Sequence, residues 1–452
     1  MKPRVLALTA VPVLLAGSVA GCAPGNRGNA EAAQPANLTV LSIQEPGHGK
    51  DYFLKQVLIP AFNKKYPNIH VNVIAVPWAQ FDSKLSTLVA AGQAPDVFSH
   101  WGASGFADYY HRGLIGDLTP YIQKYHWRNP NIPDKLMRVY QVNGRQYGVP
   151  IAFFPSFTFY NRTLFRQAGV PVPDYSWNDP RWTWDAMVRD AKRLTKDYGK
   201  PDAVYGVNWN MGNADSYGWD WGVDLYNQGA YQTGMPTDNN FANPKYIAAV
   251  KAHQDLIYRD RVAPTPAISR AVAGTGDPFL TSKIAMEPVG AWMLGQAAQA
   301  KMNFGIAPIP KGPAGTATPV LYTDPLMMAK TSKYKDAAWK FIAFFASTEG
   351  QKMWTNTTGY PPADQAAAKD WFDNFKQAGI DPNYLATLNR QAIANGKESP
   401  NHLIVGYAQI YDFLQNNLQP VFNSDKDPAK VLPPLRASFN RLLKQVQQAA
   451  AQ

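Results

Sequence analysis

Apolar and polar positions follow two periods along this chain, and the two alternate. Residues 38–43 alternate with a period of two, as strands do, whereas residues 53–62 repeat apolar positions at helical spacing. A second alternating run follows at residues 69–76. Strand, helix and strand at this spacing predict two parallel strands joined by a helix. Because Pro60 lies inside the helical run, we expect the helix to kink or end there.

The alternation continues to the C-terminal part of the chain. Helical periodicity with suitable end signals marks residues 81–91, 184–194, 244–257 and 335–346. Gly92 follows the first of these runs, and Thr183 and Asn243 are suited to cap the second and third. Short proline-bounded strands at 148–152 and 305–310 are the places where we expect the chain to pass between lobes. Strands that alternate with helices throughout predict an α/β fold.

The N-terminus has the pattern of a secretory signal. Lys2 and Arg4 precede an apolar run at residues 5–16, and small residues follow up to Cys22. The run is about a dozen residues long, whereas a membrane-spanning helix needs about 20. We therefore expect residues 1–21 to be a signal peptide that is removed.

The position of Cys22 predicts how the mature chain is held. The residues before it resemble a lipobox, in which the new N-terminal cysteine carries the lipids, and it is the chain's only cysteine. The alternative is an ordinary cleaved signal followed by a chance cysteine. Residues 22–37 are small and polar, which predicts a flexible tether. No later segment is apolar enough to span a membrane, so we expect an extracytoplasmic body with a lipid anchor.

Composition and charge limit the classes of function. With 452 residues, 46% hydrophobic and 17% charged, the chain should form a well-buried body of more than one core. Loss of Lys2 and Arg4 with the signal lowers the formal net charge of +11 by two. The basic residues are scattered, which favours a solvated basic surface near an anionic membrane or wall over nucleic-acid binding.

Six segments, in order, carry a family resemblance. They are KLSTLVAAGQAPDVF (84–98), GVPIAFFPSFTFYNRTLFRQAGV (148–170), WTWDAMVRDAKRLT (182–195), SKIAMEPVGAW (282–292), NFGIAPIPKGPAG (303–315) and DAAWKFIAFFASTEGQ (336–351). Together they resemble the family 1 bacterial extracellular solute-binding proteins, the group that includes maltose-binding protein. Two positions depart from that family's pattern: Phe154 is apolar, and Glu287-Pro288 replaces small or hydroxyl residues.

The resemblance implies a two-lobed type II periplasmic-binding-protein fold with a ligand cleft between lobes joined by hinge segments. Hinge crossings are expected near 151–154, 308–311 and 355–360. The N-terminal lobe would then be residues 38–151 plus 311–355, and the C-terminal lobe 152–310 plus 356–452. By the same resemblance the protein is a monomeric lipoprotein that captures a mono- or oligosaccharide and delivers it to the permease of an ABC importer.

A sugar site needs flat aromatic rings for the C–H faces and paired polar groups for the hydroxyls. The chain has 13 Trp and 23 Tyr, most of which must serve the core. Our candidate ligand-binding residues are Trp292, Trp101, Phe154, Trp219, Trp221, Glu45, Asp324 and Tyr407.

The candidates rest on different signals. Trp292 lies in the segment that carries a binding-site tryptophan in the family, and Trp101 follows a strand, where ligands collect in open α/β sheets. Phe154 follows the first hinge strand, with Phe153 as the alternative. Each aromatic residue has the alternative role of core packing.

The remaining candidates come from loops and from a short match near the C-terminus. Trp219 and Trp221 lie in an aromatic-rich loop, and if that segment is extended only one of them should face the cleft. Glu45 and Asp324 could accept hydroxyl hydrogen bonds, or simply stabilise turns. Tyr407 rests on the C-terminal match.

Catalytic motifs are absent from the sequence. It contains no H-E-x-x-H, G-x-S-x-G or phosphate-loop motif, and residues 47–50 (GHGK) are better interpreted as a flexible turn. The seven histidines do not cluster, and His100 and His111 flank Trp101 without ligand spacing, so we expect no metal and no cofactor.

Two alternatives remain open at this level. An extracytoplasmic glycoside hydrolase or lyase would also need aromatic platforms and a pair of carboxylates that folding could bring together. A binding protein for a non-sugar solute, such as a polyamine or a phosphodiester, would keep the fold and change the ligand. We expect a binding protein and not an enzyme.

Overall fold

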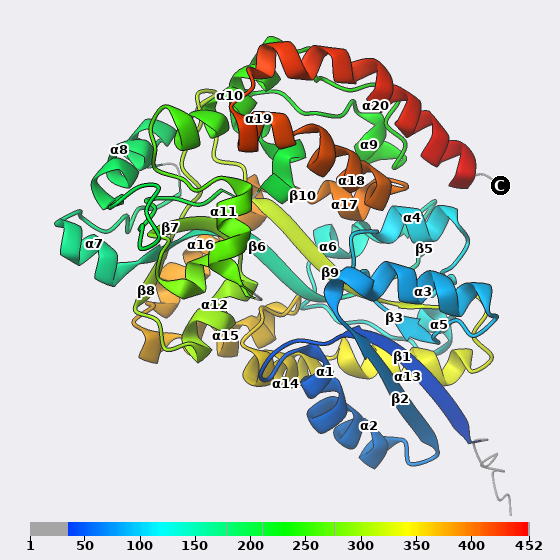
Figure 1. The fold of residues 1–452 in the computed structure, drawn as a ribbon. Coiled ribbons are helices and arrows are strands. Elements are labelled where there is room, and N and C mark those ends of the chain that lie inside the picture. Colours follow the sequence, from blue (N-terminus) through cyan, green and yellow to red (C-terminus); the bar gives the residue numbers. More distant parts are fainter. Residues whose placement is uncertain (1–34, 178, 210, 275, 451–452) are drawn as a thin grey trace, which may run out of the picture. The chain divides into compact units, whose positions relative to one another are not determined.

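Helices and strands alternate along the whole described chain (Figure 1). This computed structural model describes residues 35–450, apart from residues 178, 210 and 275 and the side chains of residues 211–213. The predicted signal peptide and Cys22 lie outside the described residues, as does most of the predicted tether. The α/β class predicted from the periodicity is confirmed.

One path of paired strands carries the fold. β1 (Ala36–Ile43) pairs in parallel with β2 (Ile69–Val76) and with β3 (Val97–Phe98). β9 (Val320–Met328) then pairs with β3 in the antiparallel sense, which gives the order β2-β1-β3-β9-β6-β7. The parallel pair expected from residues 38–43 and 69–76 is therefore confirmed.

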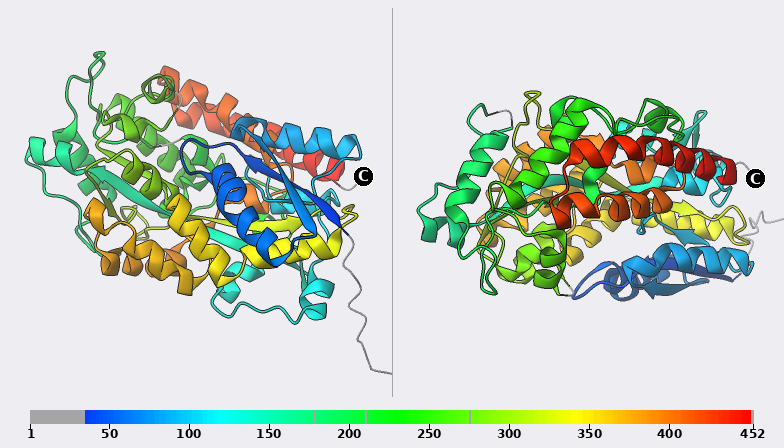
Figure 2. Two further views of the ribbon diagram at one scale, coloured as in Figure 1. Left: turned by 90° about the horizontal axis from the view of Figure 1, so that it is seen from below. Right: turned by 45° about the horizontal axis from the view of Figure 1, so that its top comes forward.

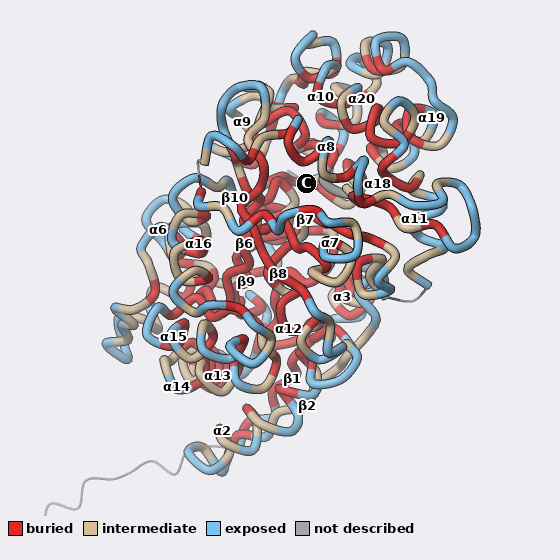
Figure 3. The backbone as a smooth tube through the Cα atoms, turned by 90° about the vertical axis from the view of Figure 1, so that its left-hand side faces the viewer, coloured by how far each residue is buried: buried red, intermediate tan, exposed pale blue. Residues whose placement is uncertain are grey.

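The long strand β6 (Val149–Asn161) changes partner along its length. Its first part pairs with β9, whereas its second part pairs with β7 (Met286–Gly290) and β8 (Phe304–Ala307). All of its residues are buried, and Figure 3 shows β6, β8 and β9 as a buried centre. The first part of β6 is apolar on both faces, and in the second part the buried Thr158 hydroxyl donates to the Pro308 carbonyl at 3.0 Å. The strand can therefore pass from one core into the next.

The buried side chains form separate cores. One core draws on residues 36–154 and 321–363, and we call this the N-terminal half. Two further cores draw on residues 157–317 and 371–443, and we call these the C-terminal half. Two halves joined through β6 and β9 match the predicted two-lobed fold, whereas the expected lobe boundaries stay a prediction.

Helices pack around both halves. Those of the N-terminal half are α1 (Lys50–Phe53), the π-helical turn η1 (Leu54–Leu58), α2 (Ile59–Lys65), the 3-10 turn η2 (Trp78–Gln80), α3 (Phe81–Ala90), α4 (Phe106–His111), α5 (Thr119–Lys124), α6 (Asp134–Arg138), α13 (Lys335–Phe345) and α14 (Thr348–Thr358). A small hairpin, β4 (Gln141–Val142) and β5 (Arg145–Gln146), precedes β6.

The C-terminal half is largely helical. Its helices are α7 (Arg162–Ala168), α8 (Trp184–Leu194), the turns η3 (Met211–Ser216) and η4 (Trp219–Trp221), α9 (Gly229–Gln232), α10 (Pro244–Tyr258), α11 (Pro266–Ala273), the turn η5 (Pro278–Thr281), α12 (Trp292–Gln299), α15 (Gln365–Asp373), the turn η6 (Lys376–Ala378), α16 (Pro382–Asn395), α17 (Pro400–Leu403), α18 (Tyr407–Asn417), α19 (Gln419–Ser424) and α20 (Pro428–Ala450). A short strand, β10 (Lys397–Glu398), pairs with β9. Figures 1 and 2 show α20 at the outer edge of the C-terminal helices.

Within the described part of the chain, none of the helices combines the length and apolarity needed to cross a membrane.

Local signals in the sequence placed several helix ends correctly. The Thr183 side chain accepts a hydrogen bond from the Ala186 amide at the start of α8, and that of Asn243 accepts one from Lys245 at the start of α10. Gly92, just after α3, has φ of +69°, a left-handed conformation that favours glycine. These predictions are confirmed. Capping residues act within one turn of helix, so the local sequence is enough to locate them.

Of the two outcomes expected at Pro60, a kink or an end, the structure excludes the end. The chain stays helical from Lys50 to Lys65, and the turn before the proline widens into a π-helical segment, Leu54–Leu58. There the Ile59 amide donates to the carbonyl of Leu54, five residues back. The local π-helical turn accompanies the proline, which cannot donate a backbone hydrogen bond, and the helix continues.

Candidate ligand-binding cavity

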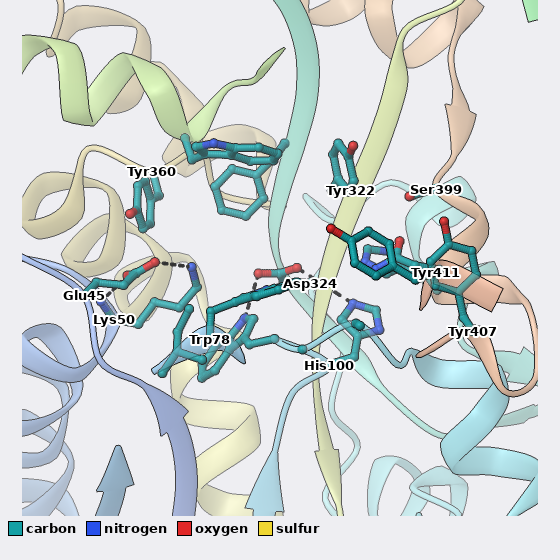
Figure 4. Close-up of a pocket in the computed structure, with 18 of the residues that line it drawn as sticks. Glu45, Lys50, Trp78, His100, Tyr322, Asp324, Tyr360, Ser399, Tyr407 and Tyr411 are labelled. Carbon is teal, nitrogen blue, oxygen red and sulfur yellow. Dashed lines mark hydrogen bonds and ion pairs between the residues drawn. The ribbon is translucent and has the colours of Figure 1, made fainter. Parts of the chain in front are cut away.

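A cavity of about 520 Å³ opens between the two halves (Figure 4). It lies beyond the carboxyl ends of the parallel strands β1 and β3, the usual place for ligands in open α/β sheets. Its walls come from β1, β3, β6, β9 and the segment around α17 and α18. The lining residues that determine its chemical character are Glu45, Lys50, Trp78, His100, Trp101, Phe154, Trp292, Tyr322, Asp324, Tyr360, His402 and Tyr407.

The loop after β3 is held by a half-buried acid, Asp82. Asp82 accepts hydrogen bonds from the amides of Ala103 and Ser104, at 2.7 and 3.1 Å, and from the Tyr109 hydroxyl. The chain passes so close that a Cβ on Gly102 would lie 2.6 Å from the Asp82 carboxylate oxygens. This anchoring fixes the direction of Trp101, which precedes the glycine.

Lys50 and Glu45 form an ion pair in one wall. The Glu45 carboxylate accepts from the Lys50 amide at 2.7 Å and from its Nζ at 3.0 Å, and Lys50 is only 7% exposed. Burial alone would lower the pKa of Lys50, but the neighbouring Glu45, Tyr360 and Asp324 outweigh it, and the pKa is raised. The lysine is therefore charged and already neutralised within the protein. The interpretation of residues 47–50 as a flexible turn missed it, because Lys50 begins α1 and is buried.

Asp324 lies at the centre of the cavity. Its Oδ2 accepts a hydrogen bond from Trp101 Nε1 at 2.7 Å. Burial raises the pKa of Asp324 to about 6, against the opposing effects of Lys50 and the Trp101 hydrogen bond. The group is ionised at neutral pH, so its remaining lone pairs can accept from a ligand's hydroxyl groups.

Two buried histidines stack behind Asp324. The rings of His100 and His402 lie 3.8 Å apart and 20° from parallel. His100 Nε2 is 2.8 Å from the Thr323 carbonyl, and His402 Nδ1 is 2.6 Å from the Glu398 carboxyl. Burial lowers both pKa values, that of His402 to about 3, so both rings are neutral. The 3.8 Å approach of His100 to Asp324 is therefore not an ion pair.

Glu398, on β10 beside β9, supports this stack through His402. It accepts hydrogen bonds from the Thr323 amide and hydroxyl, both at 2.9 Å. Burial raises the pKa of Glu398 to about 8, despite these hydrogen bonds. The group is protonated over much of the physiological range and does not line the cavity.

Three of these side chains are close enough together to suggest a metal. Donor atoms of His100, Asp324 and His402 lie within 4.8 Å of one another. However, the imidazoles are stacked, so their ring lone pairs point along nearly parallel planes and do not converge. One nitrogen of each ring also faces an oxygen of the protein. The arrangement as it stands fits a hydrogen-bonding wall better than a metal centre.

Aromatic rings complete the cavity. Phe154 makes edge contacts with Trp292 and Tyr360, at ring-centroid distances of 5.9 and 5.5 Å, and Trp292 makes one with Tyr322 at 5.1 Å. Trp78 also lines the cavity and is 48% exposed, which places a free aromatic face at its opening. These rings offer apolar faces around a polar centre.

Six of the eight predicted ligand-binding residues meet in this cavity. Trp292, Trp101, Phe154, Glu45, Asp324 and Tyr407 all line it. Phe153, the alternative to Phe154, packs in the core of the N-terminal half. The Tyr407 hydroxyl donates to Asp215 at 2.7 Å, so this tyrosine presents its ring rather than a free hydroxyl.

The structure does not bring Trp219 and Trp221 into the cavity. The segment forms the 3-10 turn η4 and is not extended, so the expected alternation of faces does not apply. Trp219 is buried beneath Lys397, and Trp221 packs edge-on against Trp184 at 5.0 Å.

Several lining residues were missed from the sequence. Tyr322 lies two residues before Asp324 on β9, so strand periodicity would place it on the same face. Trp78 follows β2 as Trp101 follows β3, which is a second usable signal. No local sequence pattern identified Lys50, Tyr360 or His402 as cavity-lining residues.

Comparison with known proteins agrees with this geometry. The family model described as bacterial extracellular solute-binding protein matches residues 46–352. A binding protein from Brucella abortus is 25% identical over 395 residues, which cover 85% of this chain and 88% of that protein. The arabinooligosaccharide-binding protein of Bacillus subtilis is 25% identical over 396 residues, 80% of this chain and 81% of that protein.

Solved structures share the fold. An ABC substrate-binding protein from Listeria monocytogenes, in complex with cycloalternan, superposes with a TM-score of 0.76 at 23% identity. The match covers 91% of this chain and 100% of that one. These relatives and structural neighbours are binding proteins.

Proposed function

This chain belongs to the bacterial extracellular solute-binding protein family, and from that premise we propose that it is the substrate-binding component of an ABC importer for a mono- or oligosaccharide. The family description indicates an extracytoplasmic location. In this proposal the sugar occupies the cavity between the two halves and is delivered intact to the membrane permease.

The observation that carries the proposal is a cavity with aromatic walls and internally balanced charges. Lys50 is paired with Glu45, both histidines are neutral, and Asp324 is the ionised group left to accept hydrogen bonds. A neutral ligand with apolar faces and hydroxyl groups fits such a site. Trp78 and Trp292, on different walls, could stack against the faces of a sugar ring.

The carboxyl groups favour binding over hydrolysis. A glycosidase needs two carboxyl groups free to act on the substrate, as acid and as base or nucleophile. Glu45 is held by Lys50, and Glu398 is occupied by Thr323 and His402, which leaves Asp324 alone. We therefore propose that the protein is not an enzyme.

A charged ligand is less well supported. A polyamine would need several free carboxylates, and a phosphodiester would need a free cation. The buried cation of the cavity, Lys50, already has a carboxylate partner at 3.0 Å. We keep the polyamine and the phosphodiester as outcomes that the ligand screen must be able to reveal.

Delivery and anchoring complete the proposal. We propose that the ligand bridges the two halves and stabilises a closed form, which docks on the permease. We further propose that the mature chain is a monomer held at a bacterial membrane by lipid on Cys22. Mass spectrometry of the membrane-extracted protein tests the anchor, and light scattering tests the oligomeric state.

The experiment for the ligand is a thermal-shift screen with product analysis. Mono- and oligosaccharides, polyamines and phosphodiesters are tested at concentrations far above the expected Kd, where a ligand at 100 times its Kd adds about 2.7 kcal/mol. We expect a sugar to raise the melting temperature and to be recovered intact. A sugar that is consumed would favour the hydrolase, and hits confined to charged compounds would overturn the carbohydrate assignment.

A further inference from the structure

A second cavity, of about 270 Å³, lies within the C-terminal half. Its lining comes from α10, α11, the start of β7 and the segments around Trp209 and Gln415, and it shares no lining residue with the first cavity. The floor carries the carboxyl groups of Glu287 and Asp277 and the imidazole of His253.

The Glu287 carboxyl group is buried, and only one of its two oxygens accepts a hydrogen bond. It is 2% exposed, and its Oε1 accepts from Asn208 Nδ2 at 2.8 Å, whereas its Oε2 has no hydrogen-bond donor. Burial raises the pKa of Glu287 well above its usual value, and the neighbouring Asp277 raises it further. Burial and the neighbouring Asp277 therefore both favour the protonated form of Glu287.

Asp277 is fixed in place by the backbone. Its Oδ1 accepts from the Phe279 amide at 2.9 Å and caps the turn η5. Burial raises its pKa too, though the Phe279 and Glu287 hydrogen bonds oppose the shift. The cap uses only Oδ1, so the other oxygen is available to Glu287 or to a ligand.

His253 adds a third acceptor. Its Nδ1 lies 2.8 Å from the Ala249 carbonyl, so Nδ1 carries the proton and Nε2 is a bare lone pair. That Nε2 is buried without a partner, and the residue is 4% exposed. Burial lowers the pKa of His253 to about 3, so the ring stays neutral and accepting.

Aromatic rings enclose these acceptors. Tyr217 stacks on His253 with centroids 3.6 Å apart and planes 1° from parallel, and Trp209 meets the same imidazole edge-on at 5.0 Å. Both line the cavity. Carboxylates beside aromatic faces are the surroundings that an organic cation prefers.

We propose that this second cavity, with Glu287, Asp277 and His253, binds a small organic cation bearing N–H groups, an alkylammonium or guanidinium ion. The N–H groups would supply the donors that the buried acceptors lack, and the positive charge would offset the negative charge of the two carboxyl groups once Glu287 releases its proton. Arg270, the cationic residue of the lining, is exposed and does not neutralise the floor.

A metal ion fits this cavity less well than an organic cation. Among the described residues, the acids of this cavity do not form a group of three donors with His253 close enough to share one ion. The acceptors are therefore spread over a space that a ligand of several atoms would span. This site is independent of the sugar proposed for the first cavity.

The test is calorimetric titration of the full-length protein at neutral pH and constant ionic strength. The probes are butylammonium, methylguanidinium, tetramethylammonium, which has no N–H group, and calcium chloride. We expect saturable binding of butylammonium or methylguanidinium, with release of protons, and none of tetramethylammonium or calcium. No saturable binding of either N–H probe, or equal binding of tetramethylammonium or calcium, would overturn the proposal.

Variants locate the binding. Glu287→Gln, which keeps the oxygen that accepts from Asn208, should weaken the cation at least about tenfold. Asp277→Asn, which keeps the Oδ1 cap, should do the same and serves if the first variant does not fold. Glu349→Gln removes an exposed acid outside the second cavity and should leave the affinity for the cation unchanged. Loss of binding in Asp324→Asn, with Glu287→Gln unaffected, would place the cation in the first cavity and refute the assignment.

Discussion

Removal of the Lys50 ammonium should destabilise the protein more than removal of the whole ion pair. The side chains of Lys50 and Glu45 are 8% and 17% exposed, so each charge has lost most of its water. In Lys50→Met the Glu45 carboxylate keeps its amide partner but loses the cation at 3.0 Å, and Asp324 loses a favourable neighbour.

The magnitude follows from the burial of the two groups. Breaking a buried pair by removing one partner costs about 3 to 5 kcal/mol, and the partial exposure of Glu45 favours the lower end, about 3 kcal/mol. Replacing both partners by neutral groups of similar shape is often close to neutral. The double variant Glu45→Gln/Lys50→Met should therefore recover at least about half of the loss.

The assay is guanidinium chloride unfolding of the parent, both single variants and the double variant, with ligand absent. The double-mutant cycle gives the interaction free energy directly. A Lys50→Met loss below about 1 kcal/mol, the size of a surface pair, would refute the reasoning. A double variant as unstable as Lys50→Met would also refute it.

Other predictions concern the ligand site and the N-terminus. Trp292→Ala should weaken sugar binding by about 1 to 3 kcal/mol in calorimetry, whereas Trp221→Ala, outside the cavity, should not. The affinity for sugar should fall as pH drops below about 6, because protonated Asp324 accepts hydrogen bonds less well, and a flat profile would contradict this. Folding raises the pKa of Glu398 from 4.5 to about 8, so the native state binds a proton that the unfolded state has released. The free energy of unfolding should therefore fall as pH rises between these values. In thermal melts, Glu398→Gln should remove this fall. Cys22→Ser should abolish the lipid mass and release the protein from membranes.

The fold could be predicted from the sequence wherever its signals are local. The alternating runs of β1 and β2 and the caps at Thr183 and Asn243 each act within a few residues, and the structure confirms them. Pro60 left two outcomes open, a kink or an end, because its effect depends on how the preceding turn responds. A π-helical turn accompanies the missing hydrogen bond there, and no periodicity predicts it.

The site was predictable only in part. Trp101 was named because it follows a strand, where the topology directs side chains to one edge, and it lines the cavity. Asp324 was named as a loop acid, but it lies on β9 and lines the same cavity. His100 and His402 lie far apart in the sequence and are brought together only by folding. Their spacing along the chain therefore could not predict that they stack. Trp219 and Trp221 were misplaced because a 3-10 turn replaced the extended segment that would have alternated their faces.

The most direct test of the account is calorimetric titration of the purified protein with the sugar that the screen identifies, alongside Trp292→Ala and Asp324→Asn and with the ligand recovered afterwards. We predict one intact sugar bound per chain and a weaker affinity in both variants. Full affinity in both variants, or a sugar that is cleaved, would contradict the claim that the cavity between the two halves is a carbohydrate-binding site of a transport protein.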